Sequence, residues 1–275
     1  MQRRRYRSAG AIALAIAAGY VLFSFRFVPA HACTIFVLTD TNHAFFFNNE
    51  DWSNPNSRIW FIPAHLGNYG YVCVGFDSGR SEGGLNTKGL AYDVVAGFEE
   101  KWRADARLRS SRGHSPQRML ETCGTVEEAI AFYRQREEPG FARCKILVAD
   151  KTGASAIIGY HEGKLQIDTS SQCRGFGYGG QTLDAMLAKH PEPTIVNGAS
   201  ILRACRQTGQ YATRYSNVFD LKSGEVFLFP FPDRDVQVTF NLFDELKKGG
   251  HYFDMPQIQE QRKQPLRRLL PNMKR

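Results

Sequence analysis

The sequence lacks the short motifs that mark several common classes of enzyme. It contains no glycine-rich dinucleotide-binding fingerprint, no P-loop and no His-Glu-x-x-His pair. Its six cysteines include no Cys-x-x-Cys pair, and no cysteine and histidine stand at the spacing typical of a zinc site. We therefore expect neither a metal nor an organic cofactor.

The chain also has little net charge once its N-terminus is set aside. Its 275 residues carry 35 Lys and Arg against 27 Asp and Glu, a formal charge of +8. Residues 1–32 hold five of the arginines and no acid, so the remainder has 30 basic against 27 acidic residues, a net charge of +3. This balance gives no support for nucleic-acid binding. The remaining length suits one large domain, residues 33–275, with a substantial core.

Residues 1–32 have the pattern of a signal peptide. Arginines gather in the first seven residues, residues 8–25 are almost wholly apolar, and Ala30-His31-Ala32 supplies the small residues of a cleavage site. We expect cleavage after Ala32 and export to the periplasm or the medium. Two alternatives stay open: an uncleaved leader, which would be the chain's contact with a membrane, or a lipoprotein acylated on Cys33.

Cleavage after Ala32 would make Cys33 the first residue of the mature protein. A thiol is the best side-chain nucleophile, and an α-amine with a pKa near ~8 can accept its proton without a histidine. The seven histidines offer no evident partner for a conventional cysteine–histidine pair. The sequence therefore predicts that Cys33 supplies both the nucleophile and its base.

The predicted strands and helices come in blocks. Apolar runs bounded by turn residues predict strands over 33–38, 44–47, 58–63, 69–76, 91–95, 145–149, 154–160, 164–168, 215–220 and 225–231. Capping residues and periodicity predict helices over 115–123, 125–136, 181–189 and 198–208. Because there is no regular βαβ alternation, we expect an α+β fold of largely antiparallel sheets with helices outside. Residues 257–275 are polar and basic, and we expect this tail to be extended or loosely docked.

Two polar residues stand where they could assist Cys33. Asp51 follows the second strand of a hairpin that begins at Cys33, so in-register pairing would return its carboxylate to the chain terminus, where it could orient the ammonium. Asn86, in the predicted turn over 83–90, could donate an N–H to a developing oxyanion. The alternatives are that Asp51 only caps a turn and that Asn86 only shapes one.

Four segments resemble the choloylglycine hydrolase and penicillin V acylase family, the linear-amide branch of the N-terminal nucleophile (Ntn) hydrolases. Cys33-Thr34 matches the family's opening Cys-Thr, and Asn48-Asn49-Glu50-Asp51 is similar to its Arg-Asn-x-Asp motif. Residues 84–90, Gly-Leu-Asn-Thr-Lys-Gly-Leu, resemble its Gly-Met-Asn-Glu-Lys-Gly-Leu turn, and 215–221 resemble its late hairpin. The resemblance spans residues 33–231.

The resemblance implies an αββα sandwich, two mostly antiparallel sheets flanked by helices, in which Cys33 attacks an amide carbonyl and water releases the acyl-enzyme. It places Asp51 on the catalytic aspartate and Asn49 on the asparagine of the motif. There are departures. Asn48 replaces the family's arginine, the late-hairpin arginine falls near Phe229, and Gln181 stands where an oxyanion asparagine is expected.

We therefore expect a hydrolase of small-molecule linear amides, of the N-acyl amine or N-acyl amino acid type. The candidate catalytic residues are Cys33, Asp51 and Asn86, and the candidate substrate-binding residues are Asn49, Gln181 and Trp52. Aromatic side chains near the predicted site would suit an apolar acyl group or form ordinary core. The alternative from another class is a catalytically inactive Ntn-fold binding protein, and a homo-oligomer is left open.

Overall fold

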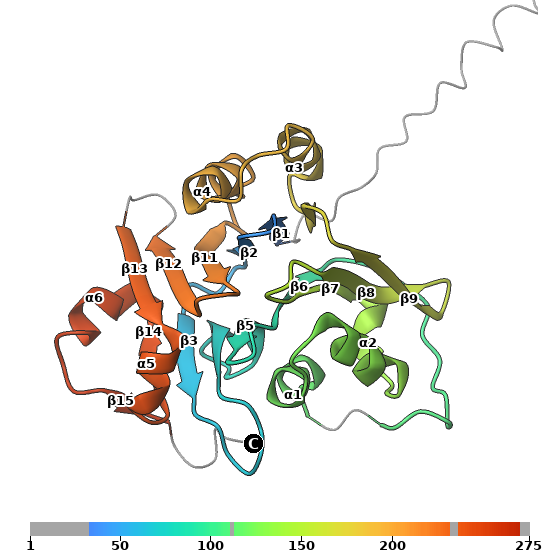
Figure 1. Ribbon diagram of the computed structural model, residues 1–275, viewed down its shortest axis with the longest axis horizontal. Helices are drawn as coiled ribbons and strands as arrows, with labels where there is room; N and C mark the ends of the chain where they lie inside the picture. Colours follow the sequence, from blue (N-terminus) through green and yellow to red (C-terminus); the bar gives the residue numbers. More distant parts are fainter. Residues whose placement is uncertain (1–32, 111–112, 232–235, 270–275) are drawn as a thin grey trace, which may run out of the picture.

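The computed structural model describes residues 33–110, 113–231 and 236–269. Two antiparallel sheets lie face to face, and helices cover the outer face of each, which gives four layers (Figure 1). The predicted αββα sandwich is confirmed. The predicted signal peptide, residues 1–32, lies outside the described residues.

The smaller sheet is built around the predicted N-terminal hairpin. Its six strands lie in the order β10 (Arg174–Gly177), β1 (Thr34–Thr39), β2 (Ala44–Asp51), β11 (Thr213–Asp220), β12 (Glu225–Phe231) and β13 (Val236–Asn241). Strands β1 and β2 pair antiparallel with Thr34 opposite Asn49. This register confirms the predicted hairpin, and it returns the end of β2 to the start of β1.

The larger sheet has nine strands, in the order β15 (Arg267–Arg268), β14 (His251–Asp254), β3 (Ser57–Ile62), β4 (Tyr71–Phe76), β5 (Ser81–Asn86), β6 (Ala91–Ala96), β7 (Cys144–Ala149), β8 (Ser155–His161) and β9 (Lys164–Ser170). The turn predicted over 83–90 is wrong in its first half, because residues 83–86 belong to β5. A Cβ at Gly84 would lie 2.6 Å from the Val72 carbonyl oxygen and 2.7 Å from Leu120 Cδ1. This glycine therefore serves close packing inside a strand.

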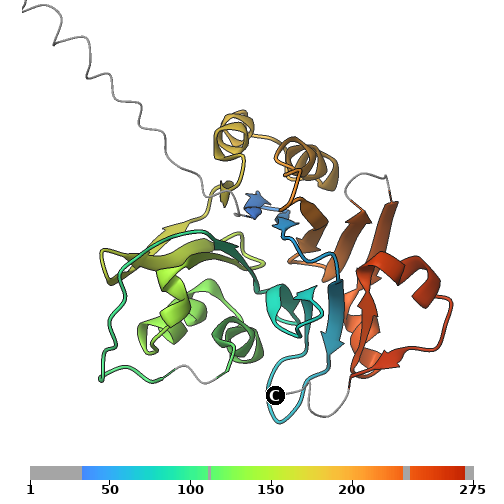
Figure 2. The same ribbon diagram turned by 180° about the vertical axis from the view of Figure 1, so that it is seen from behind.

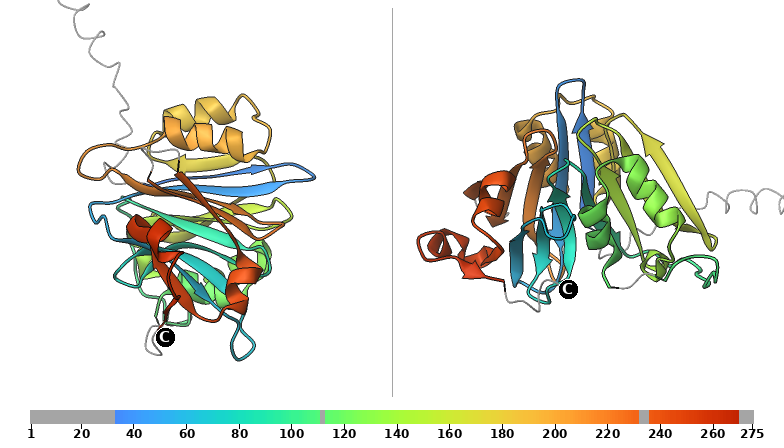
Figure 3. Two further views of the ribbon diagram at one scale, coloured as in Figure 1. Left: turned by 90° about the vertical axis from the view of Figure 1, so that its left-hand side faces the viewer. Right: turned by 60° about the horizontal axis from the view of Figure 1, so that its bottom comes forward.

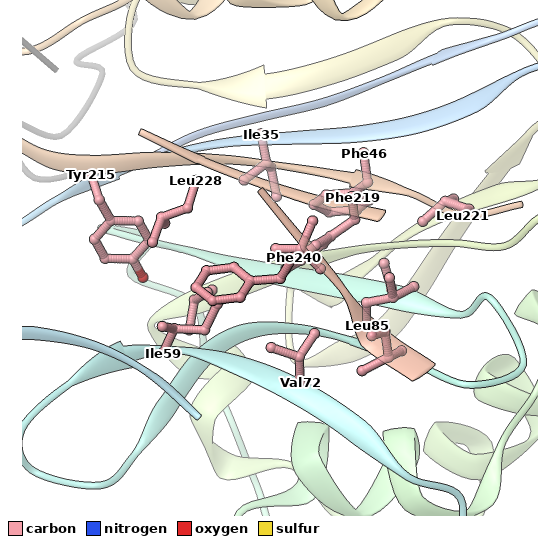
Figure 4. Close-up of a cluster of buried hydrophobic side chains, with 14 of the residues drawn as sticks. Ile35, Phe46, Ile59, Val72, Leu85, Tyr215, Phe219, Leu221, Leu228 and Phe240 are labelled. Carbon is pink, nitrogen blue, oxygen red and sulfur yellow. The ribbon is translucent and has the colours of Figure 1, made fainter. Parts of the chain in front are cut away.

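The main core lies between the two sheets. Because successive residues of a strand face opposite ways, Ile35 and Phe46 point into this space, whereas Phe36 and Phe47 point to the helices outside. Figure 4 shows Phe46 and Phe219 from the smaller sheet facing Leu85 from the larger one. Burial of this apolar surface from both sheets stabilises the sandwich at about 25 cal/mol per Å².

Two pairs of helices form the outer layers (Figures 2 and 3). Helices α1 (Ser115–Thr122) and α2 (Val126–Arg134) cover the nine-stranded sheet, and α3 (Gly180–Leu187) and α4 (Ile195–Ala204) cover the six-stranded sheet. The predicted cap of α2 is present, since the Glu128 amide donates to Thr125 Oγ1 at 3.2 Å. A Cβ at Gly198 would lie 1.9 Å from the Phe47 ring, so this glycine lets α4 rest directly on β2.

The C-terminal segment is docked more firmly than its composition predicted. After α5 (Leu242–Lys247) and β14, the short helix α6 (Ile258–Gln261) buries Ile258 completely, and β15 pairs with β14 at the edge of the larger sheet. The predicted tail, extended or loosely docked, thus begins with a short helix, and its two-residue strand β15 is exposed. Within the described residues, no helix has both the length and the apolar character needed to cross a membrane.

Candidate active site

Cys33 stands immediately before β1, beside the loop that leads from β10 into α3. The Tyr178 amide donates to the Cys33 carbonyl at 3.0 Å, and the Thr34 hydroxyl donates to the Tyr178 carbonyl at 2.9 Å. Gly177 has a φ of 125°, and a Cβ there would lie 1.9 Å from the Cys33 carbonyl oxygen. Only glycine permits this close approach, which fixes the position of the Cys33 backbone.

The Cys33 thiol contacts the carboxyl group of Glu50. The hairpin register places Glu50 across from Cys33, and Cys33 Sγ lies 3.3 Å from Glu50 Oε1. The Cys33 residue is only 5% exposed. Burial raises the pKa of its thiol well above the ordinary value, and the charges of Glu50, Asp51 and Asp93 act in the same direction.

Glu50 belongs to a group of buried carboxyls between the sheets. Burial raises the pKa of Glu50 well above its ordinary value, and the charges of Asp93 and Glu82 raise it further. Asp93 is completely buried, and its pKa is raised by burial and by Glu82. Gly83 leaves the room that this arrangement needs, because a Cβ there would lie 2.0 Å from Asp93 Oδ2. These acids therefore favour their neutral forms.

Asp51 lies beside Cys33 with one carboxylate oxygen in use. Thr213 Oγ1 donates to Asp51 Oδ1 at 2.5 Å, whereas Asp51 Oδ2 is buried and has no hydrogen-bond partner within the described part of the chain. Burial raises the pKa of the Asp51 carboxyl to about 7, opposed by the Thr213 hydrogen bond. An ammonium group at Cys33 would provide the charge that this buried carboxylate lacks.

Asn49 points the other way, towards the helix layer. Its amide Nδ2 donates to the Leu202 carbonyl of α4 at 2.8 Å, and its Oδ1 accepts from Ser216 Oγ at 2.6 Å. Asn49 therefore ties β2 to α4 and β11. The structure places its side chain on the opposite face of the sheet from the Cys33–Glu50 contact.

Asn86 is engaged in the turn after β5 and in the end of α1. Its Nδ2 donates to the Leu120 carbonyl at 2.8 Å and to the Cys123 carbonyl at 2.7 Å, which uses both amide hydrogens. Its Oδ1 accepts from the amides of Lys88 and Leu90. The structure directs Asn86 to the outer face of the larger sheet and does not bring it together with Cys33.

The other two predicted residues, Gln181 and Trp52, are exposed to solvent. Gln181 is exposed in the first turn of α3, three residues beyond Tyr178, which contacts Cys33. Trp52 follows β2, is 42% exposed, and has its ring 6.4 Å from that of Phe76 and 6.3 Å from that of Tyr211. The structure thus brings Asp51 close enough to Cys33 for its charge to act on the thiol. Gln181 lies at the start of α3 and Trp52 just after the end of β2.

The two residues that stand in place of arginines of the family pattern have distinct surroundings. Asn48 Nδ2 donates to Glu50 Oε2 and to Asn217 Oδ1, both at 3.3 Å, so Asn48 shares the inner face with Glu50. Phe229 packs against the apolar cluster beneath α3 and α4. Asn48 therefore lies on the inner face of the smaller sheet beside Glu50, and Phe229 packs beneath the helices on the outer side.

The sequence analysis missed Glu50, Asp93 and Glu82. The signal for Asp93 was an acid inside the apolar run Tyr92 to Val95, and the signal for Glu50 was its register position opposite Cys33. Within the described residues no group of His, Cys, Asp and Glu could hold a metal ion. All six cysteines are free thiols.

Comparisons with known proteins identify the fold. No protein-family model matches the sequence, and no curated protein is significantly similar to it. The structure of penicillin V acylase from Agrobacterium tumefaciens matches with a TM-score of 0.63 at 17% identity, covering 81% of this chain and 91% of that chain. A cysteine-to-alanine mutant of the conjugated bile acid hydrolase from Clostridium perfringens matches with a TM-score of 0.63 at 14% identity, covering 81% and 95%.

A second variant of the Clostridium perfringens hydrolase matches with a TM-score of 0.61 at 15% identity, covering 80% of this chain and 96% of that chain. The chain therefore has the Ntn-hydrolase fold, in the form seen in these three structures. At such low identity the likeness establishes the fold, and the chemistry must be argued from this chain's own residues.

Proposed function

We propose that this chain is an exported amidohydrolase that cleaves a linear amide, of the N-acyl amine or N-acyl amino acid type, with Cys33 as its N-terminal nucleophile. The observation that carries the proposal is the buried thiol just before β1, whose pKa the charge of nearby Asp51 raises, together with Asp51 Oδ2, a buried oxygen that has no hydrogen-bond partner among the described residues. Such an oxygen is the acceptor that a terminal ammonium at Cys33 needs. The fold shared with penicillin V acylase and conjugated bile acid hydrolase supports it.

The proposed reaction proceeds in two halves. The Cys33 α-amine takes the thiol proton, and the thiolate adds to the amide carbonyl carbon. The carbon–nitrogen bond then breaks as the ammonium returns a proton to the leaving nitrogen, which leaves a thioester. Water adds to the thioester, the α-amine takes the water proton, and Cys33 leaves as a thiolate. Throughout, Asp51 Oδ2 accepts a hydrogen bond from the α-amine and holds its orientation.

One observation favours a second function, a non-catalytic binding protein on the same fold. Burial and neighbouring carboxyls raise the pKa of the Cys33 thiol, and a thiol held in its neutral form is a poor nucleophile. Rapid reaction of Cys33 with a small electrophile near neutral pH distinguishes the enzyme from this alternative.

The test uses protein purified from the exporting host and a panel of N-acyl amines and N-acyl amino acids. We expect release of free amine from at least one member, with loss of that activity in Cys33→Ser. Cys173→Ser is the matched control, because Cys173 is another free, partly buried thiol, whose contact is with Thr39. Release of amine that survives in Cys33→Ser would refute the proposal, as would no release from the whole panel.

A further inference from the structure

Glu50 touches the sulfur atom that the proposed reaction uses, and neither the sequence motif nor the fold assigns it a role. Its Oε1 lies 3.3 Å from Cys33 Sγ, and both residues are almost completely buried. A carboxylate at this position would repel the thiolate that attack requires. The contact assists the chemistry only if the carboxyl group is neutral.

The surroundings of Glu50 favour the neutral form. From the elements packed around it, Glu50 is faced by Cys33 before β1, Tyr215 on β11, Glu82 on β5 and Asp93 on β6. None of these side chains is a cation, and the proposed mechanism pairs the ammonium of processed Cys33 with Asp51 and not with Glu50. In addition, the pKa of Glu50 is raised by burial and by the two acids. Arg80 is a cation near these acids, and its charge lowers the pKa of Glu82.

The hydrogen bonds around Glu50 indicate which oxygen carries the proton. Asn48 Nδ2 donates to Oε2 at 3.3 Å, and the Tyr215 hydroxyl lies 3.5 Å from the same oxygen. Because Oε2 already faces two donors, a proton on that oxygen would meet other hydrogens. In the resting state the Cys33 thiol itself donates to Oε1 at 3.3 Å. Once the thiol proton has passed to the α-amine, the sulfur becomes an acceptor, and the carboxyl proton is then best placed on Oε1, the oxygen that faces Cys33 Sγ.

We propose that Glu50 works as a neutral carboxylic acid whose Oε1–H donates a hydrogen bond to the Cys33 sulfur and stabilises the thiolate. No bond at Glu50 breaks: the thiol proton goes to the α-amine, and Glu50 keeps its own proton. A donor at the sulfur offsets the burial that otherwise disfavours the charged thiolate. That this hydrogen bond assists amide hydrolysis rests on the proposed function. Its effect on the pKa of the Cys33 thiol does not.

The experiment measures the rate of Cys33 alkylation by iodoacetamide against pH, by mass spectrometry, on processed protein from the exporting host. Glu50→Gln keeps a donor, because its Nε2–H can face the sulfur, and removes the ability to ionise. We expect its apparent Cys33 pKa to match that of the wild type. Glu50→Leu has no donor, and we expect its apparent pKa to rise by about one unit, which slows alkylation about tenfold at a fixed pH below it.

Two results would overturn the inference. A Cys33 pKa that falls in Glu50→Gln would mean that Glu50 is an ionised, repelling neighbour. A pKa that is equal in all three proteins would mean that the contact has no effect on the sulfur. Glu50→Gln distinguishes a neutral donor from an ionised carboxylate, and if Glu50→Leu fails to fold, Glu50→Met takes its place as the variant without a donor.

Glu245→Gln is the matched control. Glu245 is also buried, but its carboxyl contacts His251 at 3.0 Å and Lys248 at 2.7 Å, so the same substitution there should leave Cys33 alkylation unchanged. Amide hydrolysis by the same variants is measured separately. A protein that hydrolyses no amide but shows the expected alkylation profile would refute the proposed function and still support the role of Glu50.

Discussion

At the scale of single residues, the site depends on a carboxylate that is only half satisfied. Asp51 uses Oδ1 to accept from Thr213, and its buried Oδ2 has no partner within the described residues. A buried acceptor without a donor costs free energy. Cleavage of the leader would supply the missing donor as an ammonium at Cys33, so processing and the formation of the site would be one event.

This arrangement predicts a pH dependence of stability in the unprocessed chain. The Asp51 carboxyl has a pKa of about 7 in the folded protein against 3.8 for an unperturbed aspartate. Between these values the folded state holds a proton that the unfolded state has lost, so the free energy of unfolding falls as the pH rises from 4 to 7, by up to about 4 kcal/mol. Urea denaturation at several pH values measures it.

Asp51→Asn should make that decline smaller, and the part that remains comes from other buried acids with raised pKa values, such as Glu50 and Asp93. In processed wild type the ammonium should lower the Asp51 pKa, which also makes the decline smaller. Asp244→Asn is the control, because Asp244 is an exposed partner of Lys247 and should leave the slope as in the wild type. A slope that is the same with and without Asp51 would contradict the account of this residue.

Asn86 should matter for stability. Asn86→Ala removes two hydrogen bonds to carbonyls at the end of α1 and two from the amides of Lys88 and Leu90, so we expect the free energy of unfolding to fall by about 2–4 kcal/mol. Denaturation midpoints measure the loss, with the exposed Asn56→Ala as control. Unchanged stability together with a large loss of amide turnover would instead support an oxyanion role.

At the scale of elements, the position of Cys33 depends on the contact between β1 and the β10–α3 loop. Gly177→Ala would place a Cβ 1.9 Å from the Cys33 carbonyl oxygen, at a φ of 125° that alanine rarely adopts. We expect the start of β1 to shift, with slower alkylation of Cys33 and a loss of stability of about 1–3 kcal/mol. Thermal denaturation and the alkylation rate together measure both effects.

Gly180→Ala, at the first residue of α3, is the control, because a Cβ there meets no atom within 4 Å. It should leave the alkylation rate as it is in the wild type. If Gly177→Ala behaves like Gly180→Ala, the loop does not position the cysteine.

The elements that could be predicted from the sequence are those with local signals. The β1–β2 hairpin has alternating apolar residues around a polar turn, and α2 begins at the capping Thr125. The sequence predicts a turn over 83–90, which includes the end of β5, because Gly83 and Gly84 resemble turn residues, although in the strand they serve close packing. The short strand β10 is defined by its partner β1, far away in the sequence, which no local pattern reveals.

At the scale of the whole molecule, the sandwich explains why the site was predicted only in part. Cys33 and Asp51 are joined by one hairpin, so sequence spacing was enough to bring them together. Asp93 and Glu82 reach Glu50 from the opposite sheet, and only the packing of the two sheets reveals that encounter. Asn49 and Asn86 are predicted as site residues only from the motifs that contain them. A motif does not show which face of the sheet a side chain points to, and both side chains point to the outer helix layers.

The central claim is that export processing creates the nucleophile, and the most direct test is the intact mass and N-terminal sequence of the exported protein before and after iodoacetamide. The account predicts a chain that begins at Cys33, takes up one label rapidly at that residue, and does not take it up in Cys33→Ser. A chain that retains its leader, begins at another residue or carries a lipid on Cys33 would have no free α-amine there, and the mechanism proposed for this protein would be wrong.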